Sequence, residues 1–447
     1  MMKMRGTTGM KSRNIVLRIA LLTMIAISLI FSWLIWTNNA RFQRDTTDLT
    51  AKQTDTTTVQ KLSEVYLPTE VVYTDKTGQK QLLSNRKENL VDQLRQVIKT
   101  WQFGRLKTAA VTSKNYFTVI NQANTVALKY PSTVSAQIFG NAFRQSIKRT
   151  DRQKGFNRVL ILLDHHQRQT GKVYLLNDKT RKGYRVTVKK RQLTKVLKAL
   201  NQAPTRLAIT EQPLNGEPQV FYQNQVKVTQ YSYLINKQNA TDLMTTLMKR
   251  NSTDVTSKES GHSTIYNDGN YRTLRINHKQ GTVNFEDYSQ TNTEKRLTPM
   301  LTNSFKELSR LGTVPVNMRY FYFSPSNRTV VYRSYVEGYP VFNQTDFGTV
   351  EVQLLATGNK LDFSVYNLQV PLPSDQSAST LPSTQTVLTE LLNAGYSEKN
   401  IKRIQVGYRW QVNQGASSVI DLVPTYYVLM SKKWQSLDQW LAATGVN

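Results

Sequence analysis

The residues best suited to chemistry are four histidines. They are His165, His166, His262 and His278, and none forms an HExxH-type spacing, which would place two imidazoles on one helical face. Asp164 and the two histidines after it directly follow the apolar run RVLILL, where functional groups are often displayed. Neighbours on an extended chain point in opposite directions, however, so the sequence predicts no metal site.

Three short strings resemble the serine acyltransferase motifs of penicillin-binding proteins, namely Ser84-Asn-Arg-Lys87, Ser113-Lys-Asn115 and Lys76-Thr-Gly78. That chemistry needs a KTG strand supplied from far downstream, whereas here KTG precedes SNRK by a few residues. Ser84 or Asn85 is better interpreted as a helix cap. We therefore expect no catalytic residue, and measurable turnover by the purified protein would be needed to revive an enzyme hypothesis.

Cysteine and the common nucleotide motifs are absent. The chain has no cysteine, which excludes disulfides, thiolate metal sites and a cysteine nucleophile. It also lacks a P-loop, GxGxxG or GxSxG pattern, so no cradle for phosphate and no nucleophile elbow is visible. The sequence predicts no cofactor.

Positive charge is the strongest compositional feature. The 447 residues include 59 Lys and Arg against 30 Asp and Glu, a net charge of +29, which indicates anionic partners or surroundings. The stretch 179–198 holds nine basic residues and no acid. We expect a polyanion patch at Lys179, Arg181, Lys182, Arg185, Lys189, Lys190 and Arg191; a merely solvated basic face is the alternative.

An apolar segment near the N-terminus predicts a membrane anchor over residues 19–37. It reads IALLTMIAISLIFSWLIW from Ile19 to Trp36 and, at about 1.5 Å per residue, nearly spans a hydrocarbon core of roughly 30 Å. The basic leader, residues 1–18, favours a cytoplasmic N-terminus with the bulk of the chain extracytoplasmic. Trp33 and Trp36 suit the headgroup layer, and no cleavage site follows, so a retained anchor is favoured over a cleaved signal.

One face of this anchor suits contact with another membrane helix. Leu21, Ile25, Ser28, Ser32 and Ile35 share that face, and the two serines form a small-xxx-small step that permits close approach. Alternatively, the serines bond to their own helix carbonyls. Outside the membrane the available polyanions are lipid headgroups and wall polymers, so nucleic acid is not an expected partner.

The remaining chain predicts an α+β ectodomain with antiparallel sheets and packed helices. A threonine-rich stalk, 38–60, precedes an α/β region at 61–203 with a helix starting at Asn85, whose capping box uses Glu88. A middle domain, 204–312, and a C-terminal domain, 313–447, are predicted next. Each has the order strands, then a helix, then strands, which is consistent with duplicated units. Strands are expected at 401–412 and 418–430, and the polar SKESGHS at 257–263 as a loop.

Both ends of the chain resemble one family. The anchor ISLIFSWLIWTNNARFQ with its basic leader, and the C-terminal strings Ile404-Gln-Val-Gly-Tyr-Arg-Trp410 and Ile420-Asp-Leu-Val-Pro-Thr-Tyr426 with the closing Trp434, are similar to the YycH (WalH) family of Gram-positive bacteria. Pro424 is expected at the start of a late strand. The family often has tryptophan where Tyr426 stands.

The resemblance implies an accessory regulator of the WalK (YycG) sensor histidine kinase in cell-wall homeostasis. It implies that the chain acts with a YycI-like membrane protein, through transmembrane helices and ectodomains, without enzymatic activity. The expected location is the cell membrane, with a single pass. An alternative from another class is an extracytoplasmic module that binds anionic wall polymers or lipid through the basic stretch.

Overall fold

The computed structural model describes residues 21–29, 60–84, 89–163, 169–248, 255–269, 271–312, 317–343, 347–372, 378–413 and 415–443. Two compact units divide the chain, Met1–Thr56 and Thr57–Asn447. In the first unit, residues 21–29 form a helix with exposed side chains. No helix among the described residues is both long and apolar enough to cross a membrane. The rest of the expected anchor lies outside the described residues.

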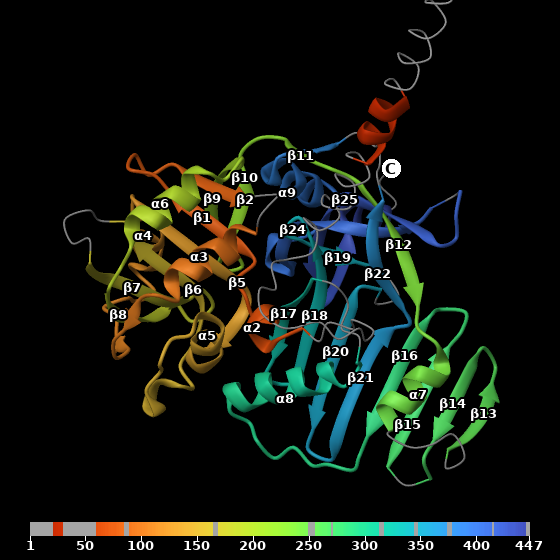
Figure 1. The fold of residues 1–447 in the computed structure, drawn as a ribbon. Helices are drawn as coiled ribbons and strands as arrows, with labels where there is room; N and C mark the ends of the chain where they lie inside the picture. The colour runs from red at the N-terminus through yellow and green to blue at the C-terminus, as the bar shows by residue number, and fades with distance from the viewer. Residues whose placement is uncertain are drawn as a thin grey trace, which may run out of the picture. The chain divides into compact units, whose positions relative to one another are not determined.

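The second unit begins with a ten-stranded antiparallel sheet, the N-terminal sheet (Figure 1). Its strand order is β10-β9-β2-β1-β5-β6-β7-β8-β3, with β4 paired to β8. The strands are β1 (Glu70–Thr74), β2 (Lys80–Ser84), β3 (Gln102–Phe103), β4 (Lys107–Thr108), β5 (Thr125–Ser135), β6 (Gly155–Leu162), β7 (Thr170–Asn177), β8 (Lys182–Lys189), β9 (Thr205–Leu214) and β10 (Glu217–Tyr222). Ser84 therefore ends a strand and caps no helix.

Helices cover the two faces of this sheet, because its central strands are apolar on both sides. The helices are α3 (Leu90–Ile98), α4 (Tyr116–Ile120), α5 (Ala136–Phe143) and α6 (Leu193–Asn201). α3 begins at Leu90, where the side chain of Asn89 accepts a hydrogen bond from the Val91 amide. Asn85 and Glu88, which were expected to start this helix, lie outside the described residues.

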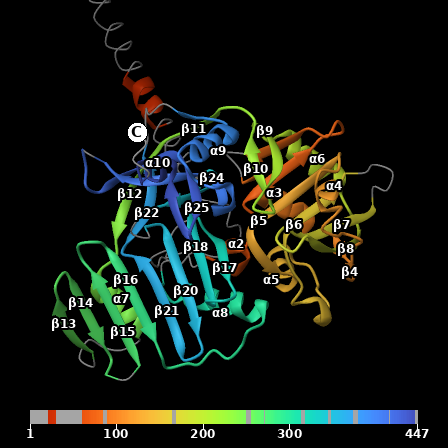
Figure 2. The ribbon, with the colours of Figure 1, turned by 180° about the vertical axis from the view of Figure 1, so that it is seen from behind.

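A 14-stranded sheet, the C-terminal sheet, occupies the second half of the unit; Figure 2 shows it from behind. Its order is β13-β14-β15-β16-β21-β20-β18-β19-β24-β25-β12-β22, with β17 beside β18 and β26 beside β25. The strands are β12 (Tyr231–Lys237), β13 (Thr256–Ser260), β14 (Ser263–Asn267), β15 (Arg272–Asn277), β16 (Thr282–Asp287), β17 (Met318–Ser324), β18 (Thr329–Val336), β19 (Tyr339–Phe342), β20 (Thr349–Leu355), β21 (Gly358–Ser364), β22 (Tyr366–Leu372), β24 (Ile401–Val412), β25 (Val419–Met430) and β26 (Lys433–Ser436).

Pairing in this sheet is antiparallel except between β19 and β24, which run parallel. Helices α7 (Ala240–Met248) and α8 (Leu297–Ser309) lie in front of its strands in Figure 1. The remaining elements are α2 (Leu62–Val65), α9 (Thr384–Asn393), α10 (Leu437–Ala443), the small pair β11 (Val226–Val228) and β23 (Ser379–Leu381), and the short 3-10 helices η1 (Arg149–Asp151) and η3 (Glu398–Asn400). The α+β class with antiparallel sheets is thereby confirmed, whereas the duplication of the last two regions stays a prediction.

The sheets cross the boundaries that the sequence indicates. β9 and β10 follow residue 203 yet extend the N-terminal sheet, and β16 pairs with β21 across residue 312. The largest hydrophobic cluster likewise joins buried residues of both sheets, including Val126 and Val352. Because strand pairing alone does not delimit a folding unit, the boundaries at 203 and 312 stay predictions.

The C-terminal strings form one hairpin. Ile404 to Trp410 lie in β24 and Ile420 to Tyr426 in β25, with Tyr408 opposite Pro424. Proline cannot donate to a ladder, and Pro424 lies between the segment of β25 that pairs with β12 and the segment that pairs with β26. The strand thus accommodates Pro424 in its interior rather than at its start.

Candidate interaction site

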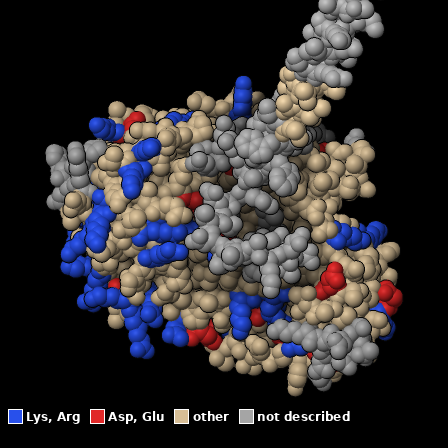
Figure 3. All heavy atoms as spheres, in the orientation of Figure 1, with Lys and Arg blue, Asp and Glu red and all other residues tan. Residues whose placement is uncertain are grey.

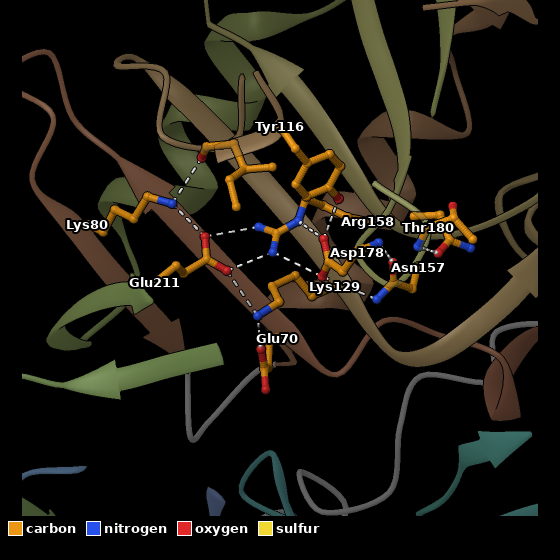
Figure 4. Close-up of polar contacts among 11 residues, drawn as sticks. Glu70, Lys80, Tyr116, Lys129, Asn157, Arg158, Asp178, Thr180 and Glu211 are labelled. Carbon is orange, nitrogen blue, oxygen red and sulfur yellow. Dashed lines mark hydrogen bonds and ion pairs between the residues drawn. The ribbon is translucent and has the colours of Figure 1, made fainter. Parts of the chain in front are cut away.

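A buried ion network lies on one face of the N-terminal sheet (Figure 4). Arg158 on β6 is its centre, and its side chain is fully buried. The guanidinium binds Asp178 through Nε at 2.9 Å and Nη2 at 3.1 Å, and Glu211 through Nη1 at 3.0 Å and Nη2 at 2.8 Å. Both carboxylates are thus held in two-point contacts, the geometry that guanidinium groups favour.

Two lysines complete the charge balance. Lys129 Nζ lies 3.1 Å from Glu211 and 3.2 Å from Glu70, and Lys80 Nζ bonds Glu211 and the carbonyl oxygen of Ile120. Strand register brings these charged side chains together, because Glu70 on β1 pairs with Lys129 on β5, and Lys129 pairs with Arg158 on β6. Directly opposite residues share a face. Three cations therefore meet three carboxylates, counting Asp178.

The network shifts the pKa of several of its members. Burial alone would raise the pKa of Glu211, but Arg158, Lys129 and Lys80 outweigh burial and hold that pKa well below its usual range. At Lys80 burial prevails over the attraction of Glu211, and the pKa of the ammonium is lowered. Burial, together with the charge of Asp178, raises the pKa of Tyr116, whose hydroxyl donates to that carboxylate at 2.5 Å. Glu211 is therefore held as a carboxylate, and Tyr116 as a neutral hydrogen-bond donor.

A groove of about 1850 Å³ opens beside the network. Its lining comes from both sheets and includes Glu70 and Lys129 on one side and Arg333, Phe342 and Trp434 on the other. The Glu70 side chain is 35% exposed, so the network meets solvent at this point. The groove can therefore receive a polar segment of a partner.

Aromatic rings and one arginine form the C-terminal wall of this groove. The Arg333 guanidinium lies 4.9 Å from the ring centroid of Phe321 and 4.3 Å from that of Phe342. Phe342 stacks on Tyr427 with centroids 4.1 Å apart and is tilted against Trp434 at 5.2 Å. The wall is consequently a packed layer of aromatic rings around one guanidinium.

Gly407 lies on β24, within the segment Ile404 to Trp410, and leaves room for the Phe342 ring in the C-terminal wall of the groove. A Cβ atom there would lie 2.8 Å from the Phe342 ring and 2.9 Å from the carbonyl oxygen of Pro340. We expect Gly407→Ala to lower the free energy of unfolding by about 1–3 kcal/mol, because the added methyl overpacks a filled site. Chemical denaturation measures this loss. Gly415→Ala, a change in the exposed β24–β25 turn, serves as the control, and equal losses would contradict the close approach.

Helix α2 joins the two sheets. The Tyr66 hydroxyl just after it donates to the carbonyl oxygen of Leu301 at 2.7 Å and lies 2.8 Å from the Tyr332 hydroxyl. Arg319 on β17 donates through Nη1 to the carbonyl oxygen of Glu64. Because α2 is the first element of the second unit, the chain enters this unit between its two sheets.

The expected partner face belongs to the first unit and the expected polyanion patch to the second. Leu21, Ile25 and Ser28 lie on the described helix of the first unit with exposed side chains, whereas Ser32 and Ile35 lie outside the described residues. Five of the seven residues of the expected polyanion patch are exposed, namely Lys179, Lys182, Arg185, Lys189 and Lys190. The other two make internal contacts.

These two arginines are Arg181 and Arg191. Arg181 donates to the carbonyl oxygen of Gly216 and lies over the Phe117 ring, while Arg191 is buried and donates to the carbonyl oxygen of Leu162 at 2.7 Å. Their part in the fold is to hold loops against the sheet.

The residues considered for chemistry do not converge. His165 and His166 lie outside the described residues; His278 bonds Thr264 through Nε2 at 2.6 Å, and its amide donates to the carbonyl oxygen of His262. Lys76 to Gly78 form the β1–β2 turn around Asp75, and Ser113 to Asn115 precede α4. Within the described part of the chain, no three His, Asp or Glu side chains are grouped to hold a metal.

Sequence reasoning missed the ion network. A usable signal existed at Arg158, because both neighbours two residues away on β6, Phe156 and Leu160, are buried. Lys129 and Glu211 each have one such buried neighbour, Ala127 and Ile209. Charges in such positions need partners from other strands. Their pairing could not be read from the sequence, because the partners are 20 and 53 residues from Arg158 along the chain.

Comparison with known proteins gives matches along the chain. Residues 15–205 match the model described as YycH protein, N-terminal domain, and residues 218–445 match YycH protein, C-terminal domain. A solved structure titled "Crystal Structure of YycH from Bacillus subtilis" is similar in fold, with a TM-score of 0.68 and 17% sequence identity over 85% of this chain and 97% of that one. No curated protein matches.

Proposed function

Because the chain belongs to the YycH family, we propose that it is a non-enzymatic, membrane-anchored regulator of a WalK/YycG-type sensor histidine kinase. Membership of this family implies a regulator of the WalK/YycG system, and the two matches along the chain are the observation that carries the proposal. The finer parts of the proposal are the anchor at 19–37, the YycI-like partner and the role in cell-wall homeostasis.

The proposed mechanism is a bias on a two-state kinase. A regulator shifts such an equilibrium only through contacts that differ between the two states. The anchor supplies contacts within the membrane, and the second unit supplies contacts outside it. Its groove is a suitable docking position for an extracytoplasmic segment of the kinase or of the YycI-like protein, because the groove presents charged side chains on one wall and packed aromatic rings on the other.

The entry of the chain between its two sheets supports this mechanism. Tyr66 contacts α8 and β18 of the C-terminal half, while α2 packs against α5 of the N-terminal half. A change at the start of the second unit would therefore reach both halves at once. We propose that α2 couples contacts made at the membrane to the groove.

The proposed anchor contact makes a prediction for its two serines. Replacing Ser28 and Ser32 with isoleucine should weaken association with partner helices about tenfold or more, because bulk fills the close-contact surface. The measurement is recovery of the sensor kinase with the tagged full-length protein from detergent-solubilised membranes. Thr23→Ile with Thr37→Ile is the matched control. Undiminished recovery with the serine variant would remove this face from the mechanism.

A second variant tests the anchor as a whole. Exchanging residues 19–37 for an unrelated transmembrane helix keeps the membrane location and removes every specific helix contact. We expect the kinase and a YycI-like protein to be recovered with the natural chain and lost with the exchanged one. Equal recovery of both proteins would place the contacts in the ectodomain instead.

A further inference from the structure

Exposed cations line one edge of the N-terminal sheet. They are Lys107 on β4, Lys172 on β7, and Arg185 and Lys189 on β8. Figure 3 shows many lysine and arginine side chains on the side of the molecule where β7 and β8 lie. Two of the four, Lys107 and Lys172, lie outside the basic stretch of the sequence and join it only through strand pairing.

Sheet register places the four cations on a common face. Lys107 pairs with Arg185, and Lys172 pairs with Thr187, which lies between Arg185 and Lys189 on β8. Opposite residues share a face at about 5 Å, and alternate residues of a strand repeat about every 7 Å. The four charges therefore form a two-dimensional array about 15 Å across. Tyr174, opposite Arg185, adds an aromatic ring to the same face.

No carboxylate neutralises this array within the described part of the chain. None of the ion pairs there involves any of the four side chains. The interior of the same sheet differs, because each cation around Arg158 meets a carboxylate. Like charges directly opposite each other, as at Lys107 and Arg185, destabilise a sheet. An anion bound at the array would relieve this repulsion.

From this arrangement we propose that the face formed by Lys107, Lys172, Arg185 and Lys189 binds a polyanionic polymer with repeated phosphate groups. A single phosphate can reach one or two of the cations, whereas a chain of phosphates can cross the strands and contact all four. Binding would release counterions and weaken steeply with salt. This site is independent of the proposed kinase contact.

Binding of long-chain inorganic polyphosphate to the full-length protein in a neutral detergent tests the proposal. The variant changes all four cations to glutamine, K107Q, K172Q, R185Q and K189Q. The control removes the same charge from exposed positions elsewhere, K258Q, R275Q, K279Q and K399Q. We expect affinity to fall at least about tenfold in the variant, with a shallower salt dependence, and to change less than about twofold in the control.

Several results would overturn this assignment. Equal weakening in the variant and the control would mean that only net charge matters. Absence of binding by the natural chain would remove the site, as would full competition by equal concentrations of monophosphate. The last measurement uses vesicles of phosphatidylcholine and phosphatidylglycerol. If the four substitutions weaken binding to these vesicles but not binding to polyphosphate, the face binds lipid instead. An unfolding temperature no lower than that of the natural chain, in both variants, shows that loss of folding is not the cause; relief of repulsion raises it in the four-cation variant.

Discussion

Replacing Arg158 with methionine is expected to lower the free energy of unfolding by about 3–5 kcal/mol, because two buried carboxylates lose their shared cation. Asp178 and Glu211 would stay in the interior, with Lys80 and Lys129 as the remaining cations near Glu211. Chemical denaturation of the full-length protein measures the loss. Arg185→Met, at an exposed position of β8, is the control and should change stability by less than about 0.5 kcal/mol.

The pH dependence of this loss has a definite sign. In the natural chain the pKa of Glu211 is depressed, so its stabilising contribution is present above the unfolded pKa of about 4.3 and is lost as pH falls through the folded pKa. Without Arg158, burial favours the protonated form of Glu211, so acid lowers the cost of keeping this carboxyl group in the interior. The stability difference should therefore be largest near neutral pH and narrow below about pH 4.5. A difference that grows on acidification would contradict the network.

The second large effect is expected at Tyr66. Tyr66→Ala removes a fully buried ring and two hydrogen bonds between α2 and the C-terminal half, which should cost about 3–5 kcal/mol. Tyr66→Phe, which keeps the ring, should cost about 1–2 kcal/mol. Tyr271→Ala, with a side chain 59% exposed, is the matched control.

Hydrogen exchange locates the effect of Tyr66. If the ring joins the two halves, its removal should speed amide exchange in α8 near Leu301 and in β18 near Tyr332, as well as in α2. Faster exchange confined to α2 would mean that the junction does not transmit a change to the C-terminal half.

The sequence was most informative where local pattern and structure agree. The strands expected at 401–412 and 418–430 occur as β24, Ile401–Val412, and β25, Val419–Met430. Gly312 and Gly395 follow helices α8 and α9 and have φ of +72° and +89°, the left-handed conformation in which glycine commonly ends a helix. In these segments hydrophobic alternation and glycine conformation depend on neighbouring residues, so the sequence contains the needed information.

Local sequence patterns could not predict which strands pair with one another. The polar SKESGHS was expected as a loop, but Thr256–Ser260 form strand β13, an edge strand whose residues are all exposed. Arg158, Glu211 and Lys129 come together only through the order of strands. The sequence indicated only part of the basic face, namely Arg185 and Lys189. Lys107 and Lys172 join them through strand register rather than sequence proximity.

The most direct test of the proposed regulation is the autophosphorylation rate of a purified WalK/YycG-type kinase in liposomes, with and without the full-length protein and its YycI-like partner. We predict a change of about fivefold or more in either direction, typical of allosteric coupling, which is lost when residues 19–37 are exchanged for an unrelated helix. An identical rate under all conditions, with the proteins correctly inserted, would contradict the account.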